Sequence, residues 1–537
     1  MKRYFNFTLI AAILLTFLSQ SSCKKGWLDV NYNPQQLTDN VVTPDLLLPP
    51  LLLECAALPP DFEILSMWLG YWAAPTLGTN QSLTNYTDVV TGSIASSSVP
   101  ILEQKSADLG QEFYLGIAKV VRALMWSRCV DKLNFVPYTE AYNPAILHPK
   151  YDNGQPIYDD LIKQLTEASG LIKNADVTKN LKITISDIMF HGDKTKWLQF
   201  INTLKLRLLI HQANRPDRAA YIAAEIQVIK DQGSGFLPMG VEGAVNPGWI
   251  ISTAVNPYFG LYSSHNIRGG ARGDIYTGIT SPDMAHANEY GLNMLKSDND
   301  PRIGFIYSST DNVKPASGAE PFPQPAPSNF RGSRFGLSFS SFQYPYQNRV
   351  YLSAVGGSRN IDVVTPASSG IIKGNNMDSW IITSVENAFL QAEAVFRGWL
   401  PGDAEQAYQT AIKASFRWLN LGGNAATPAL SDAVFNAWYS SQVNNQRVNW
   451  TTAPDKYKLI MYQKYIGLNG IDPIETWTDY RRNGRFPDVP VSADPTRIAN
   501  TVPIRFMYTP REILTNMVEI KKLGEINAFT DKIWWMP

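Results

Sequence analysis

The segment from Val385 to Trp418 constrains the fold of this chain more than any other stretch. Its first half places apolar residues at helical spacing, which gives one stripe along a helix face. These residues are Val385, Ala388, Phe389, Ala392, Phe396 and Trp399. Pro401-Gly402 then interrupts the helix, and Asp403 can cap a second helix with Gln406 three residues later. The second helix repeats the stripe through Ala404, Ala407, Tyr408, Ala411, Ser415 and Trp418. The sequence therefore predicts an antiparallel helical hairpin.

Neither helix of this hairpin can bury its stripe alone, so the hairpin needs helical neighbours. It has about the length of a tetratricopeptide unit, ~34 residues, although it lacks the full consensus of that repeat. A lone helical hairpin in another all-α fold is the alternative. Both interpretations predict a mainly α-helical protein.

Further helices are predicted on both sides of the chain's middle. Helical periodicity indicates helices over 106–129, 157–172, 194–211, 217–230, 431–443 and 456–467. An irregular tail is expected after the last of these. The order along the chain is therefore helices, a stretch of different character, and helices again.

The middle of the chain, from Gly233 to Trp380, is rich in Gly, Pro, Ser and Asn, and only Pro282–Leu295 shows helical periodicity. So long a stretch with little regular structure favours a functional insertion over a linker. We expect a single domain over residues 23–537. Its predicted parts are a helical scaffold at 43–232 and 381–480 and an irregular, ligand-facing insertion at 233–380.

The charge balance excludes several classes of partner. The chain has 537 residues with 47 basic and 47 acidic side chains, so its formal net charge is zero. It therefore has no basic field that would hold nucleic acid or an anionic membrane surface. This composition suits an extracytoplasmic protein that binds a neutral ligand.

The N-terminus predicts export and lipid anchoring. Lys2-Arg3 precede an apolar run from Phe5 to Leu18, and Ser21-Ser22 lead to Cys23. This order is that of a secretory signal peptide, residues 1–22, too short for an ordinary membrane span. A cysteine at this point is similar to a bacterial lipoprotein cleavage site, where acyl chains would anchor the mature protein. A soluble exported protein with a spare cysteine is the alternative.

The sequence shows no catalytic constellation. No two of the five histidines are closer than 20 positions, and His211 falls on an apolar helix face, where a hydrogen-bonded core histidine is expected. Asp159-Asp160 are adjacent on a helix and point in different directions. We expect no enzymatic activity, no cofactor and no metal site. A glycoside hydrolase with carboxylates from distant segments is the alternative. A disulfide between Cys55 and Cys129 is left open.

Aromatic side chains in polar loops indicate saccharide binding. Sugars present flat C–H faces and many hydroxyls, so a site needs rings beside amide and hydroxyl groups. The candidate ligand-binding residues are Trp72, Asn80, Tyr86, Trp249, Tyr258, Tyr262, Asn266 and Tyr344. The alternative is that these rings pack the insertion onto the helices. We expect the site where the insertion meets the loop 71–98.

Short motifs also follow one another in a specific order. They are Val136–Ala141 with Tyr151-Asp152, Gly192–Trp197 with Leu204–Arg207, Asp300-Pro301-Arg302, Gln391–Ala394, Gln463-Lys464-Tyr465, and Trp477 with Arg481–Gly484. Trp27–Asn31 behind Cys23 adds to the pattern. Together these motifs resemble the SusD/RagB-like family of outer-membrane nutrient-binding lipoproteins.

The resemblance implies an α-rich body of about four tetratricopeptide-like hairpins with an irregular ligand-facing insertion. It also implies a non-catalytic protein at the outer membrane, lipid-anchored on the cell surface, with a TonB-dependent SusC-like transporter as partner. The ligand implied is a nutrient, with an oligosaccharide as the leading choice and a peptide as the runner-up. The motif residues themselves are mostly structural in that family.

Overall fold

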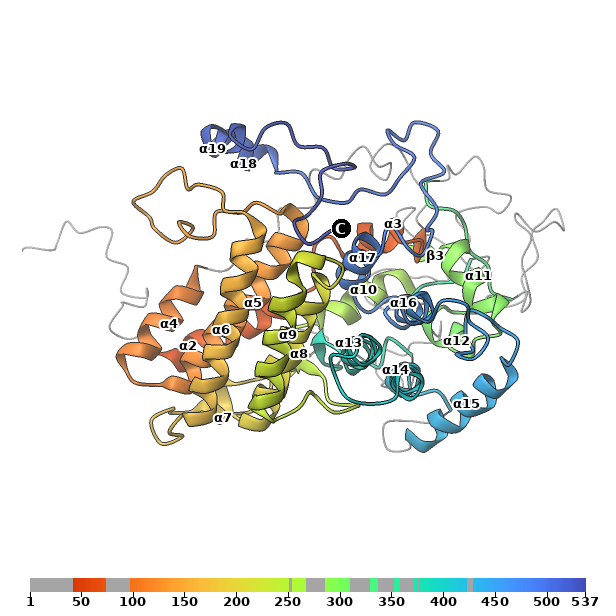
Figure 1. Cartoon of the computed structure of the whole chain (residues 1–537), viewed down its shortest axis with the longest axis horizontal. Coiled ribbons are helices and arrows are strands. Elements are labelled where there is room, and N and C mark those ends of the chain that lie inside the picture. Colours follow the sequence, from red (N-terminus) through yellow and green to blue (C-terminus); the bar gives the residue numbers. More distant parts are fainter. Residues whose placement is uncertain are drawn as a thin grey trace, which may run out of the picture.

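A computed structural model describes residues 42–73, 97–250, 254–266, 285–309, 329–336, 352–357, 370–374, 376–422 and 428–537. Within these residues the chain is mainly helical, which confirms the predicted fold class (Figure 1). The predicted lipidation site Cys23 and the predicted signal peptide lie outside the described residues. No helix in the described ranges is both long and apolar enough to cross a membrane.

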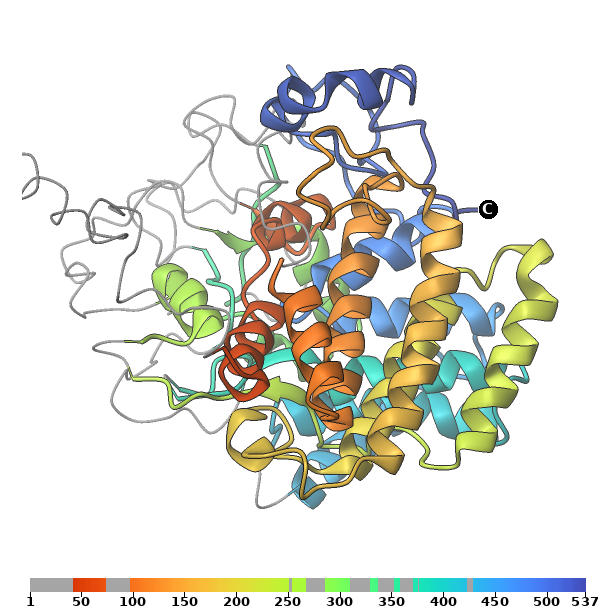
Figure 2. The same cartoon turned by 90° about the vertical axis from the view of Figure 1, so that its left-hand side faces the viewer.

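Most helices of the first half of the chain form a layer on one side of the molecule, whereas the helix Phe62–Trp68 lies apart from them beside the helix Pro473–Arg482 (Figures 1 and 2). The helices are α2 (Pro44–Cys55), α3 (Phe62–Trp68), α4 (Ser98–Asp108), α5 (Glu112–Leu133), α6 (Gly154–Asn174), α7 (Ile183–Ser186), α8 (Lys194–His211), the 3₁₀ turn η3 (Pro216–Arg218) and α9 (Ala219–Gln232). The long helix α5 packs between α4 and α6, and α6 packs in turn on α8. Successive helices thus bury one another's apolar stripes, which is compatible with tetratricopeptide-like hairpins.

The second half contains the predicted hairpin and its neighbours. Its helices are α13 (Ser384–Phe396), α14 (Ala404–Trp418), α15 (Pro428–Ser441), α16 (Lys456–Gly467), α17 (Pro473–Arg482), α18 (Pro510–Thr515) and α19 (Met517–Lys521). Helices α13 and α14 pack on each other, and the Asp403 carboxylate accepts a hydrogen bond from the Gln406 backbone N–H at 2.8 Å. The hairpin and its cap are therefore confirmed. Its partners are α15 and α16, and α13 also contacts α8, which joins the two halves.

The insertion is attached to the scaffold by short strands and helices. They are β2 (Gly243–Val245), α10 (Pro257–Asn266), β3 (His286–Ala287), α11 (Glu289–Ser297), α12 (Ile303–Ile306) and β4 (Ser379–Ile382). Strand β3 pairs antiparallel with β1 (Trp72–Ala73), and β2 pairs antiparallel with β4. Insertion residues such as Phe259, Leu292 and Tyr307 belong to the same hydrophobic core as the helices. The described part of the insertion is therefore integrated into the core.

Several predicted boundaries are wrong for identifiable reasons. The predicted helix 106–129 is two helices, because Gly110 adopts a left-handed conformation (φ +62°) between α4 and α5. Helix α10 was not predicted within the insertion, and α2 has Pro49 and Pro50 inside it. Helix α17 falls in the predicted irregular tail. The open question of a disulfide is answered as well, since Cys55 and Cys129 do not form one.

Candidate functional site

Three of the predicted ligand-binding rings pack together in the core. The ring of Phe62 lies 5.6 Å from that of Trp72, 5.9 Å from that of Tyr258 and 6.5 Å from that of Tyr262. Tyr258 also stacks on Trp380 at 3.8 Å. All three predicted rings are at most 4 % exposed. They cannot serve as open stacking platforms in this structure. Their packing agrees with the alternative that these rings hold the insertion onto the helices.

The other predicted ligand residues have different positions. Trp249 is half-buried, and its indole N–H has no acceptor among the described residues, so it stays a candidate. Asn266 ends α10, and its side chain lies outside the described part. Asn80, Tyr86 and Tyr344 also lie outside it. The junction of the insertion with loop 71–98 is therefore described only in part.

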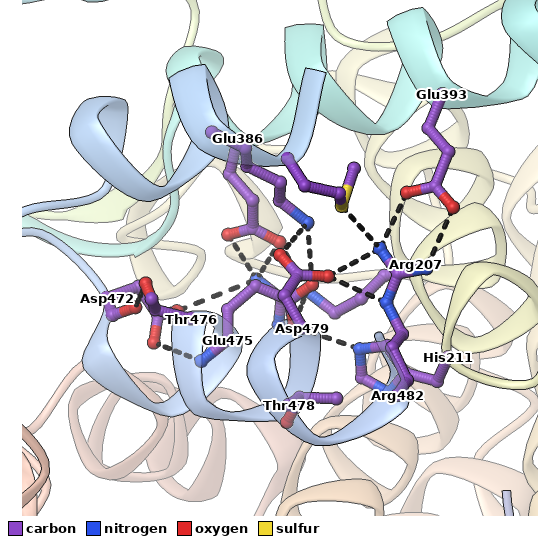
Figure 3. Close-up of polar contacts among 12 residues, drawn as sticks. Arg207, His211, Glu386, Glu393, Asp472, Glu475, Thr476, Thr478, Asp479 and Arg482 are labelled. Carbon is purple, nitrogen blue, oxygen red and sulfur yellow. Dashed lines mark hydrogen bonds and ion pairs between the residues drawn. The ribbon is translucent and has the colours of Figure 1, made fainter. Parts of the chain in front are cut away.

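A buried network of ion pairs joins α8, α13 and α17 (Figure 3). Arg207 on α8 donates from Nε and Nη2 to the two carboxylate oxygens of Glu386, each at 2.5 Å. His211, one turn further on α8, lies 2.9 Å from Glu475 through Nε2. Its Nδ1 lies 2.9 Å from the Tyr158 hydroxyl. His211 is thus a hydrogen-bonded core histidine, as the sequence predicted.

The network continues from Glu475 toward the far end of α17. Lys464 on α16 contacts Glu475 at 3.0 Å and Asp479 at 2.8 Å. Arg482 donates to both oxygens of Glu393 on α13, at 2.8 and 2.6 Å. Figure 3 shows Glu393 reaching down from its helix to Arg482. Four helices are therefore connected by charges that find their partners within the protein.

The pKa values show how strongly these charges are coupled. Burial lowers the pKa of His211, but Glu475 and Asp131 outweigh burial and raise it to about 9. Burial raises the pKa of Glu393, whereas Arg482 and Arg397 hold it at about 2. Both side chains are therefore charged at neutral pH. Because every member is paired and buried, the network stabilises the fold and offers no surface to a substrate.

The sequence motifs meet in and beside this network. Arg207, Glu393, Lys464 and Arg482 come from four separate motifs. Arg302 of the Asp-Pro-Arg motif donates to Gln463 at 2.8 Å. The expectation that these motifs are mostly structural agrees with their positions.

An open groove lies between the insertion and the C-terminal segment. It has a volume of about 890 Å³ and is bounded by α11, the residues 334–335, α16 and the segment 490–497. Asn288 caps α11, because its side-chain oxygen accepts the Tyr290 N–H at 3.0 Å. Helix α11 therefore presents Tyr290, Asn293 and Ser297 to the groove from a fixed position. The groove is the candidate ligand site.

The groove combines an aromatic ring with polar groups. Tyr290 is half-buried, so part of the side chain faces solvent. The side-chain oxygen Oδ1 of Asn293 is buried and has no hydrogen-bond donor among the described residues. Arg447 pairs with Asp298 at 2.5 Å, and Arg334 pairs with Glu289 at 3.2 Å. Two of the three arginines that line the groove are thus paired with carboxylates, whereas Arg497 donates to the Asn500 side chain and to the Asp494 backbone carbonyl.

Sequence reasoning did not select these groove residues. Tyr290 and Asn293 lie in the stretch Pro282–Leu295, for which the sequence predicts a helix and no contact with a ligand. Asn288 before the helix was a usable capping signal. The segment 490–497 is distant from α11 in the sequence and lies near it only in the folded protein, so no local pattern links the two.

No catalytic or metal centre is found in the described ranges. Asp159 pairs with Arg218, and Asp160 accepts a hydrogen bond from Tyr138, so the two carboxylates serve different contacts. The described residues hold no cluster of three or more His, Cys, Asp or Glu suited to a metal ion.

Comparison with known proteins identifies the class. The family model SusD-like_2, described as "Starch-binding associating with outer membrane", matches residues 78–509. This match covers more than half of the chain, so the chain belongs to the SusD-like family of nutrient-binding proteins. No curated protein matches the sequence.

Solved structures of SusD homologues share the fold. A SusD homologue from Bacteroides fragilis NCTC 9343 is 18% identical, with a TM-score of 0.66 over 92% of this chain and 99% of that one. A chitin-binding SusD homologue from Flavobacterium johnsoniae is 19% identical, with a TM-score of 0.67 over 92% and 98%. A SusD/RagB family protein from Bacteroides thetaiotaomicron VPI-5482 is 18% identical, with a TM-score of 0.64 over 92% and 99%.

Proposed function

We propose that this chain is a non-catalytic, lipid-anchored surface protein that binds an oligosaccharide and delivers it to a TonB-dependent SusC-like transporter in the outer membrane. The observation that carries the proposal is the match of residues 78–509 to a family described as starch-binding and associated with the outer membrane. A fold-level relative that binds chitin supports a glycan ligand. A peptide is the alternative ligand, and a glycoside hydrolase is the alternative activity.

The groove beside α11 is the proposed place of binding. Its aromatic ring, amide and hydroxyl side chains and hydrogen-bond-donating arginines suit a ligand with many hydroxyls. Trp249, Asn80, Tyr86, Asn266 and Tyr344 remain proposed contributors from the insertion and the loop 71–98. Binding there would rest on stacking and hydrogen bonds.

Calorimetric titration of the mature protein with maltohexaose, chitohexaose and a mixed peptide library tests the ligand class. We expect saturable heat with one of the saccharides and no sugar release over hours of incubation. Binding of peptides alone would move the proposal to the alternative ligand. Product release that disappears when one Asp or Glu is replaced would favour the hydrolase.

The lipid anchor has its own test. Cys23→Ala is expected to give a folded protein that no longer fractionates with membranes, because the acyl chains supply the attachment. A Cys55→Ala variant serves as the matched control and should stay in the membrane fraction. Retention of the Cys23→Ala protein in membranes washed with high salt would reject lipid anchoring.

A further inference from the structure

A second hollow lies in the helical body, away from the groove. It has a volume of about 650 Å³ and is bounded by α4, α5, α6 and the loop 138–144. This volume falls within the range of about 300–1,000 Å³ that small-molecule sites occupy. Figure 1 places α4, α5 and α6 at the opposite end of the molecule from α11. The hollow is therefore separate from the proposed ligand groove.

Two tyrosines of the hollow are held in place by a buried tryptophan. The rings of Tyr138 and Tyr142 lie 5.1 and 6.0 Å from that of Trp126, both at nearly right angles to it. The indole N–H of Trp126 donates to the Tyr142 hydroxyl at 3.0 Å, and the Tyr138 hydroxyl donates to Asp160. Both tyrosines are half-buried. The hollow thus has a fixed aromatic wall that requires little ordering on binding.

Three of the four charged side chains that line the hollow are paired with opposite charges within the protein, and the fourth, Asp160, accepts a hydrogen bond from Tyr138. Arg122 donates from Nε to Glu103 at 2.8 Å and also from Nη2. Lys119 contacts the Gln164 side-chain oxygen and lies 2.9 Å from Glu167. Opposite charges therefore face each other across the helices. The lining residues carry two positive and two negative side chains, so their formal charges cancel.

Hydrogen-bonding capacity nevertheless remains on three walls. The Nη1 group of Arg122 on α5 and the Nε2 group of Gln164 on α6 have no acceptor in the part of the chain that the structure describes. The Oδ1 atom of Asp160 has no donor there. Donors and acceptors are thus interleaved beside aromatic rings, and the charged groups cancel. A ligand that matches this pattern has hydroxyls that both donate and accept, and apolar C–H faces.

We propose that this hollow is a second saccharide-binding site, independent of the groove. It accepts a short neutral segment of a glycan through Arg122, Gln164 and Asp160, with the ring edges of Tyr138 and Tyr142 against the C–H faces. A protein with two such sites at opposite ends can hold one long glycan at two points or two glycans at once. The gain in apparent affinity then depends on glycan length.

Hydroxyl-radical footprinting of the full-length protein with maltohexaose or chitohexaose separates the two sites. Met294 and Tyr290 report on the groove, and Tyr138 and Tyr142 report on the hollow. The same titrations are run with Gln164→Leu and Asp160→Asn, which keep the side-chain volumes. Lys163→Ala is the matched control, because Lys163 is the neighbour of Gln164 on α6 with a side chain 71% exposed.

We expect one of the saccharides to protect Tyr138 and Tyr142, with half-protection shifted at least about fivefold to higher concentration in Gln164→Leu and Asp160→Asn. Lys163→Ala should behave like the parent, and protection of Met294 should be unchanged in all variants. Protection of the groove alone overturns the second site and leaves the proposed function standing. Protection of the hollow alone supports the second site and removes the groove as the binding place. Protection of neither by either sugar overturns both.

Discussion

The buried ion network and the open groove use similar side chains for different ends. In the network, Arg482 donates to Glu393 and Asp479, and all three are buried among four helices. In the groove, Arg447 is half-exposed beside Asp298, and the amide oxygen of Asn293 has no partner among the described residues. Polar groups whose partners are all internal hold the fold. Polar groups with unused hydrogen-bonding capacity at a solvent-open hollow are available to a ligand.

The largest effect is expected from removing a carboxylate of the network. Glu393→Ala leaves the buried Arg482 and the partly exposed Arg397 without their shared partner, and we expect a loss of about 3–5 kcal/mol in the free energy of unfolding. Urea-induced unfolding followed by circular dichroism measures it. The matched control is Asp432→Ala, which removes the partner of Arg417 from a partly exposed pair and should cost less than about 1 kcal/mol. Equal losses in the two variants would contradict the distinction between buried and exposed pairs.

The next effect is a pH dependence that belongs to the network alone. The pKa of His211 is raised to about 9 from its usual value of 6.5. Because the folded value is the higher one, protonated His211 stabilises the protein fully below about pH 6.5. This contribution is lost as the pH rises from there through about 9. The gap corresponds to about 3 kcal/mol at most.

Unfolding free energies of the parent and of His211→Gln between pH 6 and 10 test this sign. The difference between the two proteins isolates His211, since the other groups titrate in both. We expect the parent's advantage over the variant to shrink as the pH rises. An advantage that is constant or grows with pH would mean that His211 is neutral in the folded protein.

The fold was predictable where a helix has one apolar face. The predicted helix 157–172 lies within α6, whose buried residues Ile157, Leu161, Leu165, Ala168 and Ile172 recur at helical spacing. Helix α17 escaped prediction because its buried surface includes Glu475, Asp479 and Arg482, which leave no apolar stripe. Its start nevertheless carries a local signal, since Asp472 precedes Pro473 and accepts hydrogen bonds from the backbone N–H groups of Ile474 and Glu475.

The site was less predictable because burial depends on contacts distant in sequence. Tyr258 and Tyr262 lie in a polar, irregular stretch of the sequence. In the structure they belong to α10, and both rings pack against Phe62 in the core. Conversely, Asn293 lines the groove together with residues from Pro490 to Arg497, which come nearly 200 positions later in the sequence. Composition alone cannot distinguish an aromatic ring that packs from one that waits for a ligand.

A smaller effect is expected from a groove residue. Asn293→Ala removes an oxygen with no donor among the described residues, so we expect unfolding free energy to change by less than about 0.5 kcal/mol. Saccharide affinity should fall by about 1 kcal/mol, roughly fivefold, because the partly exposed Asn293 side chain no longer lines the groove with a hydrogen-bonding amide. Calorimetry and urea unfolding on the same preparation give both numbers. A stability loss without an affinity loss would make Asn293 a member of the fold rather than of the site.

The smallest effect concerns salt, and it tests whether the groove's charges are as balanced as their contacts indicate. Arg447 lies 2.5 Å from Asp298 and Arg334 lies 3.2 Å from Glu289, so two of the three groove arginines are paired and Arg497 is the third. Salt screens charges that act across solvent, with a Debye length of about 10 Å at 0.1 M, and has little to act on here. Affinity for the saccharide should therefore change less than about twofold between about 50 and 500 mM NaCl. An oligogalacturonate of the same length provides the comparison, since any binding of that polyanion should weaken with salt. A steep loss of affinity for the neutral sugar would show that charged side chains of the groove contribute to binding. The groove would then resemble the buried network in depending on charge, and the contrast between the two regions would fail.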